Sequence, residues 1–208
     1  MLLRLLLLAL CSLPFAASAQ TGLKLQLVSE QTAVVPGKPF TVGLWIQHDR
    51  GWHTYWRFPG IVGVPTQMKW DLPKGWKVGP LVYPEPERTL MFQIKAQGFD
   101  RDVMLRTEVT PPEGLKPGGT VTLSGKASWM CCGNSCHPGA MDLNLTLPVA
   151  AAAEVDEKWH ALLDAERARA EHTSDAWKAE ATEKGSEITL TLRPVDARAA
   201  LRRNQGDA

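Results

Sequence analysis

The sequence predicts an all-β protein: an immunoglobulin-like antiparallel β-sandwich, followed by a helical segment and the start of a second β domain. Three observations lead to this prediction. Apolar and polar residues alternate with a period of two over much of residues 23–149, which places one face of each strand on a core. Proline and glycine clusters separate the alternating runs, as in sandwiches built from short strands. After Ala150, alanine and charged residues dominate, which favours helix.

The sandwich is expected to occupy residues 20–149. The alternating runs are 23–27, 40–46, 68–72, 103–109, 121–129 and 141–147. Turn formers such as Pro36-Gly37, Pro73-Lys74-Gly75 and Pro117-Gly118-Gly119 lie between them. Each run is therefore interpreted as a strand with one face on the core and the other in water.

Two segments follow the sandwich. Residues 150–184 are predicted to be a helical linker, with Val155, Trp159 and Leu162 at helical spacing. Residues 185–208 contain one expected strand, EITLTL at 187–192, and a polar, basic tail. Because a single strand needs a neighbour for its hydrogen bonds, this part is interpreted as the beginning of a truncated second domain.

The first 19 residues are typical of a cleavable signal peptide. Arg4 is followed by an apolar run, and Ala17-Ser18-Ala19 supplies a small-residue cleavage site. A lipoprotein acylated on Cys11 is disfavoured because Leu10 is too large to precede such a cysteine. Since no later run is long enough to cross a bilayer, the mature chain is expected to be exported without a membrane span. The net charge of +1 implies no nucleic-acid partner.

Three of the four cysteines lie in the stretch SWMCCGNSCHPG. In an oxidising compartment a disulfide among Cys131, Cys132 and Cys136 is expected, and the odd number leaves one thiol over. Cys132 and Cys136 can be joined across a turn. If the strand continues through the pair, Cys131 faces the opposite way and is buried as a small apolar residue.

Three functions compete for this cluster. A structural disulfide is the simplest function, although a disulfide that closes such a short loop would stabilise the fold only weakly. Thiol exchange needs two close, accessible cysteines, and His137 could stabilise a thiolate. A copper(I) site would use Cys131, Cys132, Cys136 and His137 as soft ligands.

An aromatic segment, GWHTYWRFPG at residues 51–60, accompanies the cluster. Trp52 and Trp56 are expected to cover one end of the core. His53 is interpreted as a packing or hydrogen-bonding residue rather than a ligand. The sequence shows no serine–histidine–aspartate pattern, phosphate-binding loop or paired carboxylates.

Three motifs, in order, resemble the N-terminal periplasmic domain of the DsbD/ScsB-type thiol:disulfide interchange proteins. They are GWHTYWRFPG, VPTQMKWDLPKGWKVGPLVYPEPER and SWMCCGNSCHPG followed by LNLTLP. The resemblance covers about residues 22–149. It implies an immunoglobulin-like periplasmic module that is reduced by a thioredoxin-like donor and then reduces periplasmic disulfide oxidoreductases.

The resemblance also implies roles for individual residues. Cys132 and Cys136 match the redox pair, with Cys136 forming mixed disulfides and Cys132 resolving them. Trp129 belongs to the same motif, and Phe92 is the counterpart of an aromatic cap that shields the pair in the family. No cofactor beyond the disulfide is implied.

The chain departs from the family pattern in two ways. Cys131 stands where the motif usually has an apolar residue, so copper(I) binding or a non-catalytic interaction remains the alternative function. The sequence contains neither a membrane-spanning conduit nor a thioredoxin-like domain. Activity as an independent enzyme is therefore left open, and the reductant is expected to be another protein.

Overall fold

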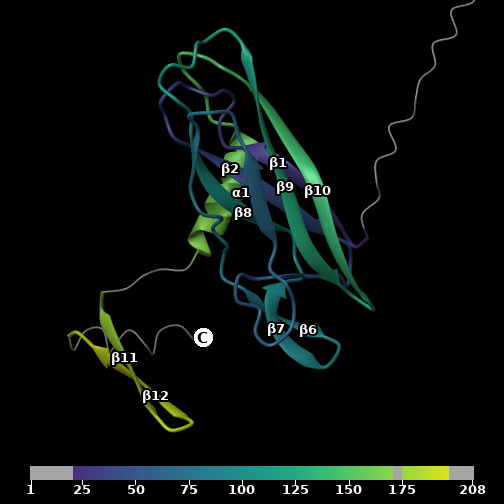
Figure 1. Cartoon of the computed structure of the whole chain (residues 1–208), viewed down its shortest axis with the longest axis vertical. Helices are drawn as coiled ribbons and strands as arrows, with labels where there is room; N and C mark the ends of the chain where they lie inside the picture. The colour runs from purple at the N-terminus through teal and green to yellow at the C-terminus, as the bar shows by residue number, and fades with distance from the viewer. Residues whose placement is uncertain (1–20, 171–174, 197–208) are drawn as a thin grey trace, which may run out of the picture. The chain divides into compact units, whose positions relative to one another are not determined.

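A computed structural model describes residues 21–170 and 175–196 (Figure 1). The predicted signal peptide and the end of the basic tail lie outside these residues. The chain divides into two units, residues 1–169 and 170–208. No helix in the described ranges is long and apolar enough to cross a membrane.

The first unit is an antiparallel, immunoglobulin-like β-sandwich, which confirms the predicted fold class. One sheet has the strand order β1-β2-β8-β5 and the other β10-β9-β4. A smaller sheet, β3-β7-β6, lies at the end of the sandwich where β9 turns into β10 (Figure 1). The strands are β1 Leu23–Ser29, β2 Phe40–His48, β3 Thr54–Tyr55, β4 Gln67–Asp71, β5 Lys77–Val78, β6 Glu87–Met91, β7 Ile94–Phe99, β8 Val103–Thr110, β9 Thr120–Cys132 and β10 Cys136–Pro148.

The core forms where the alternation predicted it. Alternate residues of the sandwich strands are buried between the sheets, while the residues between them face outwards. The buried set includes Val42, Leu44, Ile46, Val103, Leu105, Val109, Leu123, Ala127, Trp129 and Leu147. Each of the six predicted runs coincides with a strand in the structure, except that Leu72 lies one residue beyond β4.

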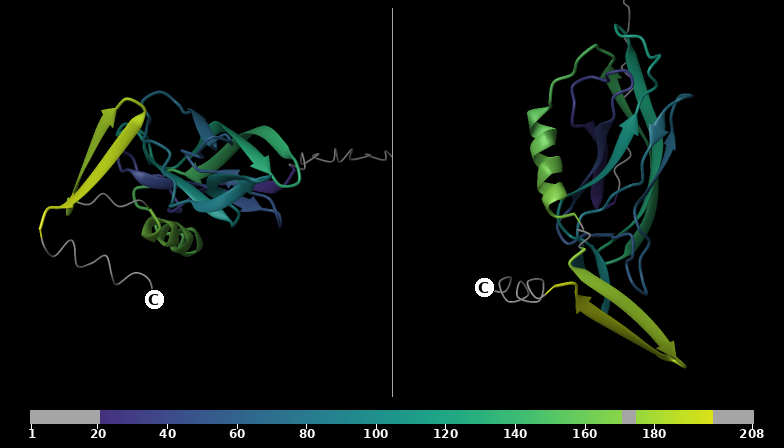
Figure 2. Two further views of the ribbon diagram at one scale, coloured as in Figure 1. Left: turned by 90° about the horizontal axis from the view of Figure 1, so that it is seen from below. Right: turned by 90° about the vertical axis from the view of Figure 1, so that its left-hand side faces the viewer.

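One helix, α1 (Glu157–Ala168), packs on the outer face of the β1-β2-β8-β5 sheet (Figure 2). Asp156 caps its first turn by accepting a hydrogen bond from the Trp159 amide at 3.2 Å. Leu163 is fully buried against Val28 and Met104. The helix therefore belongs to the body of the first unit, where the sequence predicted a linker.

The second unit corrects the prediction for residues 177–184. These residues form strand β11 (Trp177–Lys184) instead of helix and pair with β12 (Glu187–Pro194) across a turn at Gly185. Alanine, glutamate and lysine favour helix by less than about 1 kcal/mol each, so pairing with β12 overrides the preference. The expected single strand is thus half of a hairpin, whose exposed apolar residues include Ile188, Leu190 and Leu192.

An ion-pair cluster ties α1 to the sandwich. The Arg167 guanidinium contacts both carboxylate oxygens of Glu30, at 2.7 and 2.5 Å. His160 lies 2.7 Å from the same carboxylate. These hydrogen bonds hold the pKa of Glu30 at about 2, below its ordinary value of 4.5, although burial acts in the opposite direction.

We expect the Glu30 cluster to make stability depend on acid pH. Glu30 stays ionised in the folded protein down to about pH 2, whereas in the unfolded chain it takes up a proton near pH 4.5. Its contribution, on the order of 2 kcal/mol, is therefore complete above about pH 4.5 and lost as the pH falls towards 2. Urea unfolding of wild type and Glu30→Gln at pH 7, 4 and 3 measures it. The difference in the free energy of unfolding between the two proteins should become smaller from pH 7 to 4 and from pH 4 to 3. A difference that stays constant would contradict the lowered pKa of Glu30.

Candidate functional site

The disulfide between Cys132 and Cys136 closes the turn that joins β9 to β10. The two residues face each other in the strand register, with Cα atoms 4.1 Å apart and sulfur atoms 2.01 Å apart. Gly133, Asn134 and Ser135 form the loop between them, and the Gly133 amide donates to the Ser135 carbonyl at 3.0 Å. The strands thus bring the cysteines together, and the three-residue loop lets the chain reverse.

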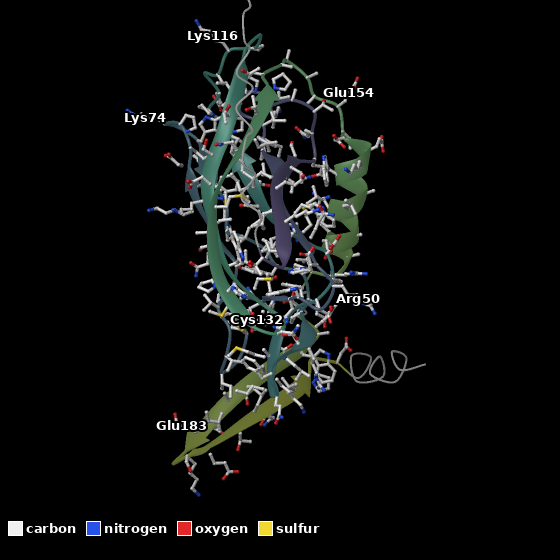
Figure 3. All side chains as sticks on the ribbon, turned by 90° about the vertical axis from the view of Figure 1, so that its right-hand side faces the viewer. Arg50, Lys74, Lys116, Cys132, Glu154 and Glu183 are labelled. Carbon is white, nitrogen blue, oxygen red and sulfur yellow. A yellow bond between two sulfur atoms is a disulfide. The ribbon has the colours of Figure 1, made fainter. Side chains whose placement is uncertain are left out.

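Access to the two sulfur-bearing residues differs. Cys132 is 1% exposed, whereas Cys136 is half-buried. A partner thiol that approaches from solvent therefore meets Cys136 first. Cys132 lies at the end of the sandwich from which β6 and β7 project (Figure 3).

Cys131 lies on the opposite face of β9. Strand alternation turns its side chain into the sandwich core, where it is a fully buried free thiol. Cys132 instead packs outside the sandwich, with Tyr55 and Ala96. Burial, together with the charge of Asp49, raises the pKa of the Cys131 thiol to about 12.

We expect Cys131 to be unreactive in the folded protein, because almost none of it is thiolate at neutral pH. After reduction, native protein that lacks residues 1–19, and with them Cys11, should react with iodoacetamide at pH 7 first at Cys136 and more slowly at Cys132, and Cys131 should label only in denaturant. Mass spectrometry of wild type and Cys131→Ala, which should show two adducts in both conditions, checks this. A third adduct formed at a similar rate under native conditions would contradict the prediction.

The other predicted site residues occupy different positions. His137 lies at the rim, where its Nε2 is 2.7 Å from the Ser135 hydroxyl and its ring is 5.6 Å from that of Trp52. Trp129 is buried in the core, and its indole fills the space over Gly139, where any Cβ would lie within 2.5 Å of the ring. Trp129 therefore supports the hairpin from the core side, away from the face that carries the disulfide.

Phe92 lies in the two-residue turn between β6 and β7. Its φ of 56° is a left-handed conformation that bulky residues rarely adopt, and its side chain is 67% exposed. We call residues 87–99, which comprise β6, this turn and β7, the cap hairpin.

A small apolar cluster covers the disulfide from the outer face. Its buried members are Tyr55, Ala96 and Cys132, and Val62, Met91, Met130 and Cys136 are partly buried around them. Met91 and Ala96 come from the cap hairpin. The cap hairpin therefore contacts the disulfide cluster through Met91 and Ala96, residues that the motif analysis did not identify.

The GWHTYW segment, residues 51–56, connects this cluster to β9 through backbone hydrogen bonds. The backbone N–H and C=O of His53 pair with those of Cys132, at 2.9 and 3.0 Å. The His53 Nε2 lies 3.2 Å from the Tyr55 hydroxyl, and burial lowers the pKa of His53. His53 is thus a buried hydrogen-bonding residue, as the sequence indicated. Alternation along 53–55 could have identified Tyr55 as its neighbour on the same face.

The residues of the proposed copper(I) set point to different sides of the hairpin. Cys131 faces the core, and Cys132 and Cys136 face outwards, where Met91 and Met130 are their sulfur neighbours. Within the described residues, three or more histidine, cysteine, aspartate or glutamate side chains bring potential ligand atoms within 4.8 Å of one another only at Glu30, His160 and Asp164. There the Arg167 guanidinium already occupies both Glu30 oxygens, so the group is an ion-pair cluster.

Comparisons with known proteins bear on the family and the fold of the chain. The family described as "Thiol:disulfide interchange protein DsbD, N-terminal" matches residues 24–148. Among solved structures, the N-terminal periplasmic domain of ScsB from Proteus mirabilis is similar in fold, with a TM-score of 0.61 and 20% identity. The match covers 85% of this chain and 66% of that one.

A second solved structure, the reduced N-terminal domain of DsbD from Neisseria meningitidis, has a TM-score of 0.30 at 13% identity, over 62% of this chain and 89% of that one. A comparison with curated protein sequences found no match. The family match covers more than half of the chain and includes both bonded cysteines. The chain therefore belongs to the DsbD N-terminal family, and its sandwich is a thiol:disulfide interchange domain.

Proposed function

We propose that this domain passes reducing equivalents through the Cys132–Cys136 disulfide, from a thioredoxin-like donor to periplasmic disulfide oxidoreductases. The observation that carries the proposal is the unequal access to the pair: Cys136 is half-buried, and Cys132 is covered. Thiol exchange needs one sulfur that partners can reach and a second that is held beside it to resolve the mixed disulfide. The family match and the fold of the ScsB periplasmic domain support the periplasm as the compartment.

The exchange would proceed in two displacements. A donor thiolate attacks Cys136 Sγ, the Cys132–Cys136 bond breaks, and its electron pair leaves on Cys132 Sγ, which takes a proton. The donor's second thiolate then attacks the donor's first sulfur, which is bonded to Cys136 Sγ in the mixed disulfide. That bond breaks, and the Cys136 thiolate is released. The donor dithiol is thereby oxidised to a disulfide, and this domain is reduced to two thiols. Transfer to an acceptor disulfide is the same sequence in reverse, begun by the Cys136 thiolate.

The surface beside the disulfide suits a protein partner. Six large apolar side chains are strongly exposed on the loop after β3 and on the cap hairpin: Phe58, Ile61, Val64, Leu90, Phe92 and Ile94. The loop lies beside the cap hairpin, because the Gln97 amide donates to the Pro59 carbonyl at 2.9 Å. Clustered exposed apolar residues mark interaction sites. Any protein that reaches Cys136 would contact this surface, and Phe92 would act as a movable cap within it.

A trapping experiment tests the proposal. The reduced Cys132→Ser variant is mixed with a thioredoxin-like protein that keeps only its attacking cysteine, activated as a thionitrobenzoate adduct. Cys136 should form a mixed disulfide that persists, because no resolving thiol remains. In the matched Cys136→Ser variant the remaining Cys132 is buried, so the adduct should form at least about tenfold more slowly.

Non-specific thiol reactivity is measured with the small disulfide dithionitrobenzoate on both variants. The preference for Cys136 should be larger with the protein than with the small reagent, since the apolar surface contacts only the protein. Equal rates for the two variants, or adducts through Cys132, would refute the proposed exchange. A disulfide in wild type that no dithiol reduces would favour the structural role.

A further inference from the structure

Arg101 connects α1 to the cap hairpin. Its Nε donates to Glu87 Oε1 of β6 at 2.8 Å, and its two terminal nitrogens donate to the Glu166 carboxylate of α1 at 2.6 and 3.2 Å. The Glu166 side chain is only 8% exposed. A bidentate guanidinium–carboxylate contact restrains both distance and orientation. Glu87, Arg101 and Glu166 therefore form a bridge of defined geometry.

A second bond joins the same two elements. The backbone amide of Glu85, just before β6, donates to the carbonyl of Arg169 at 2.7 Å. Arg169 is the C-cap residue that directly follows α1. The C-terminal end of the helix is thus attached to the start of the cap hairpin by a side-chain bridge and by a backbone hydrogen bond.

The two strands of the cap hairpin are restrained unequally, because β7 pairs with β3 and buries Ala96 and Phe99. In the order β3-β7-β6, β6 is an edge strand that pairs only with β7 among the described strands. At the far end of β6, Met91 packs in the cluster that covers Cys132. The position of β6 relative to the disulfide therefore depends on its pairing with β7, on Met91 at its C-terminal end and on Glu87 at its N-terminal end. The Arg101 bridge is at that N-terminal end.

We propose that Arg101 is a positioning residue: by joining Glu87 to Glu166, it holds the cap hairpin against the Cys132–Cys136 disulfide and limits access to it. The helix that covers the sandwich thereby also sets how often the disulfide is uncovered. The role of that access in electron transfer rests on the proposed function. The restraint itself is a property of the fold and can be tested without a protein partner.

The test is the rate at which dithiothreitol reduces the disulfide in the full chain, followed by quenching with N-ethylmaleimide and mass spectrometry. Three variants each remove one charge of the bridge: Arg101→Met breaks it, and Glu87→Gln and Glu166→Gln weaken it. Each should speed reduction by roughly three- to tenfold, because local opening limits access to a covered bond. The double variant Arg101→Met/Glu166→Gln should be no faster than Arg101→Met alone, since the bridge is already broken.

The charges of these residues separate positioning from electrostatics. Removing a positive charge at Arg101 and removing a negative charge at Glu87 would affect an attacking thiolate in opposite directions, but both release the hairpin. Arg167→Met is the matched control. It breaks the other anchor of α1, at Glu30, without touching the cap hairpin. The thermal unfolding temperature of every variant is also measured, so that reduction rates are compared between variants with a similar loss of stability.

Accelerated reduction in all three bridge variants, with a wild-type rate in Arg167→Met, supports the inference. Wild-type rates in the bridge variants would overturn it, and so would opposite shifts for Arg101→Met and Glu87→Gln or equal acceleration by Arg167→Met. The proposed function fails separately. If no mixed disulfide forms in the trapping experiment while the bridge variants still accelerate reduction, exchange is wrong and positioning stands.

Discussion

Replacement of Cys136 by alanine is expected to abolish electron transfer to and from protein partners, a loss of at least about a hundredfold in rate. Cys136 is the more exposed of the two bonded cysteines, and the remaining Cys132 is covered by Tyr55, Met91 and Ala96. The variant should stay folded, because a disulfide that closes so short a loop contributes only about 2 kcal/mol. The measurement is reduction of the domain by a thioredoxin-like dithiol, or oxidation of the reduced domain by an acceptor.

Cys131→Ala is the matched control for this prediction. It removes a neighbouring cysteine from the same strand but leaves the disulfide intact, because Cys131 lies on the core face. Its exchange rate should remain near that of wild type. Substantial transfer by the Cys136 variant, or a loss in the Cys131 variant as large as that expected for Cys136, would contradict the assigned roles.

Tyr55→Ala should cause the largest loss of stability around the site. Tyr55 is fully buried on β3, pairs with Gly98 of β7 and packs against Cys132. Truncation of a buried aromatic residue leaves a cavity and typically costs about 3–5 kcal/mol. Here the cavity would open under the disulfide and beside the cap hairpin, so we also expect faster reduction by dithiothreitol. Urea unfolding of the oxidised protein measures the loss.

Tyr55→Phe separates packing from hydrogen bonding. It keeps the ring but removes the hydroxyl that lies 3.2 Å from His53 Nε2. The cost should fall to about 1 kcal/mol, with little change in the reduction rate. A Tyr55→Phe variant as unstable as Tyr55→Ala would show that the hydroxyl, and not the ring, holds this cluster together.

Much of the sandwich was predictable from the sequence because its strands have one buried and one exposed face. That environment imposes a period of two, which six runs show without ambiguity. The same alternation predicted that adjacent Cys131 and Cys132 would face opposite ways, as they do. At these positions the alternation of buried and exposed residues along one strand was sufficient for the prediction.

The cap hairpin was not predicted as a pair of strands. Its sequence, ERTLMFQIKAQGF, does not alternate cleanly, because β6 is an edge strand and only the second half of β7 is buried, by contacts with β3 and the end of β9. Strand β11 was mistaken for helix for a related reason. Its alanines and charged residues favour helix locally, and only the partner β12, which follows the turn at Gly185, makes the extended form better.

The sequence by itself determined the fold class, the six longer strands of the sandwich and the pair of cysteines that the turn could join. These follow from alternation, turn residues and spacing, which act over a few neighbouring positions. Only the tertiary structure decided what surrounds the pair: Tyr55 and Met91 over Cys132, and Arg101 between Glu87 and Glu166. Glu87 and Glu166 are far apart in the chain, and their approach depends on α1 packing across the sheet. No local pattern encodes that packing, because it arises when separate elements bury their apolar faces together.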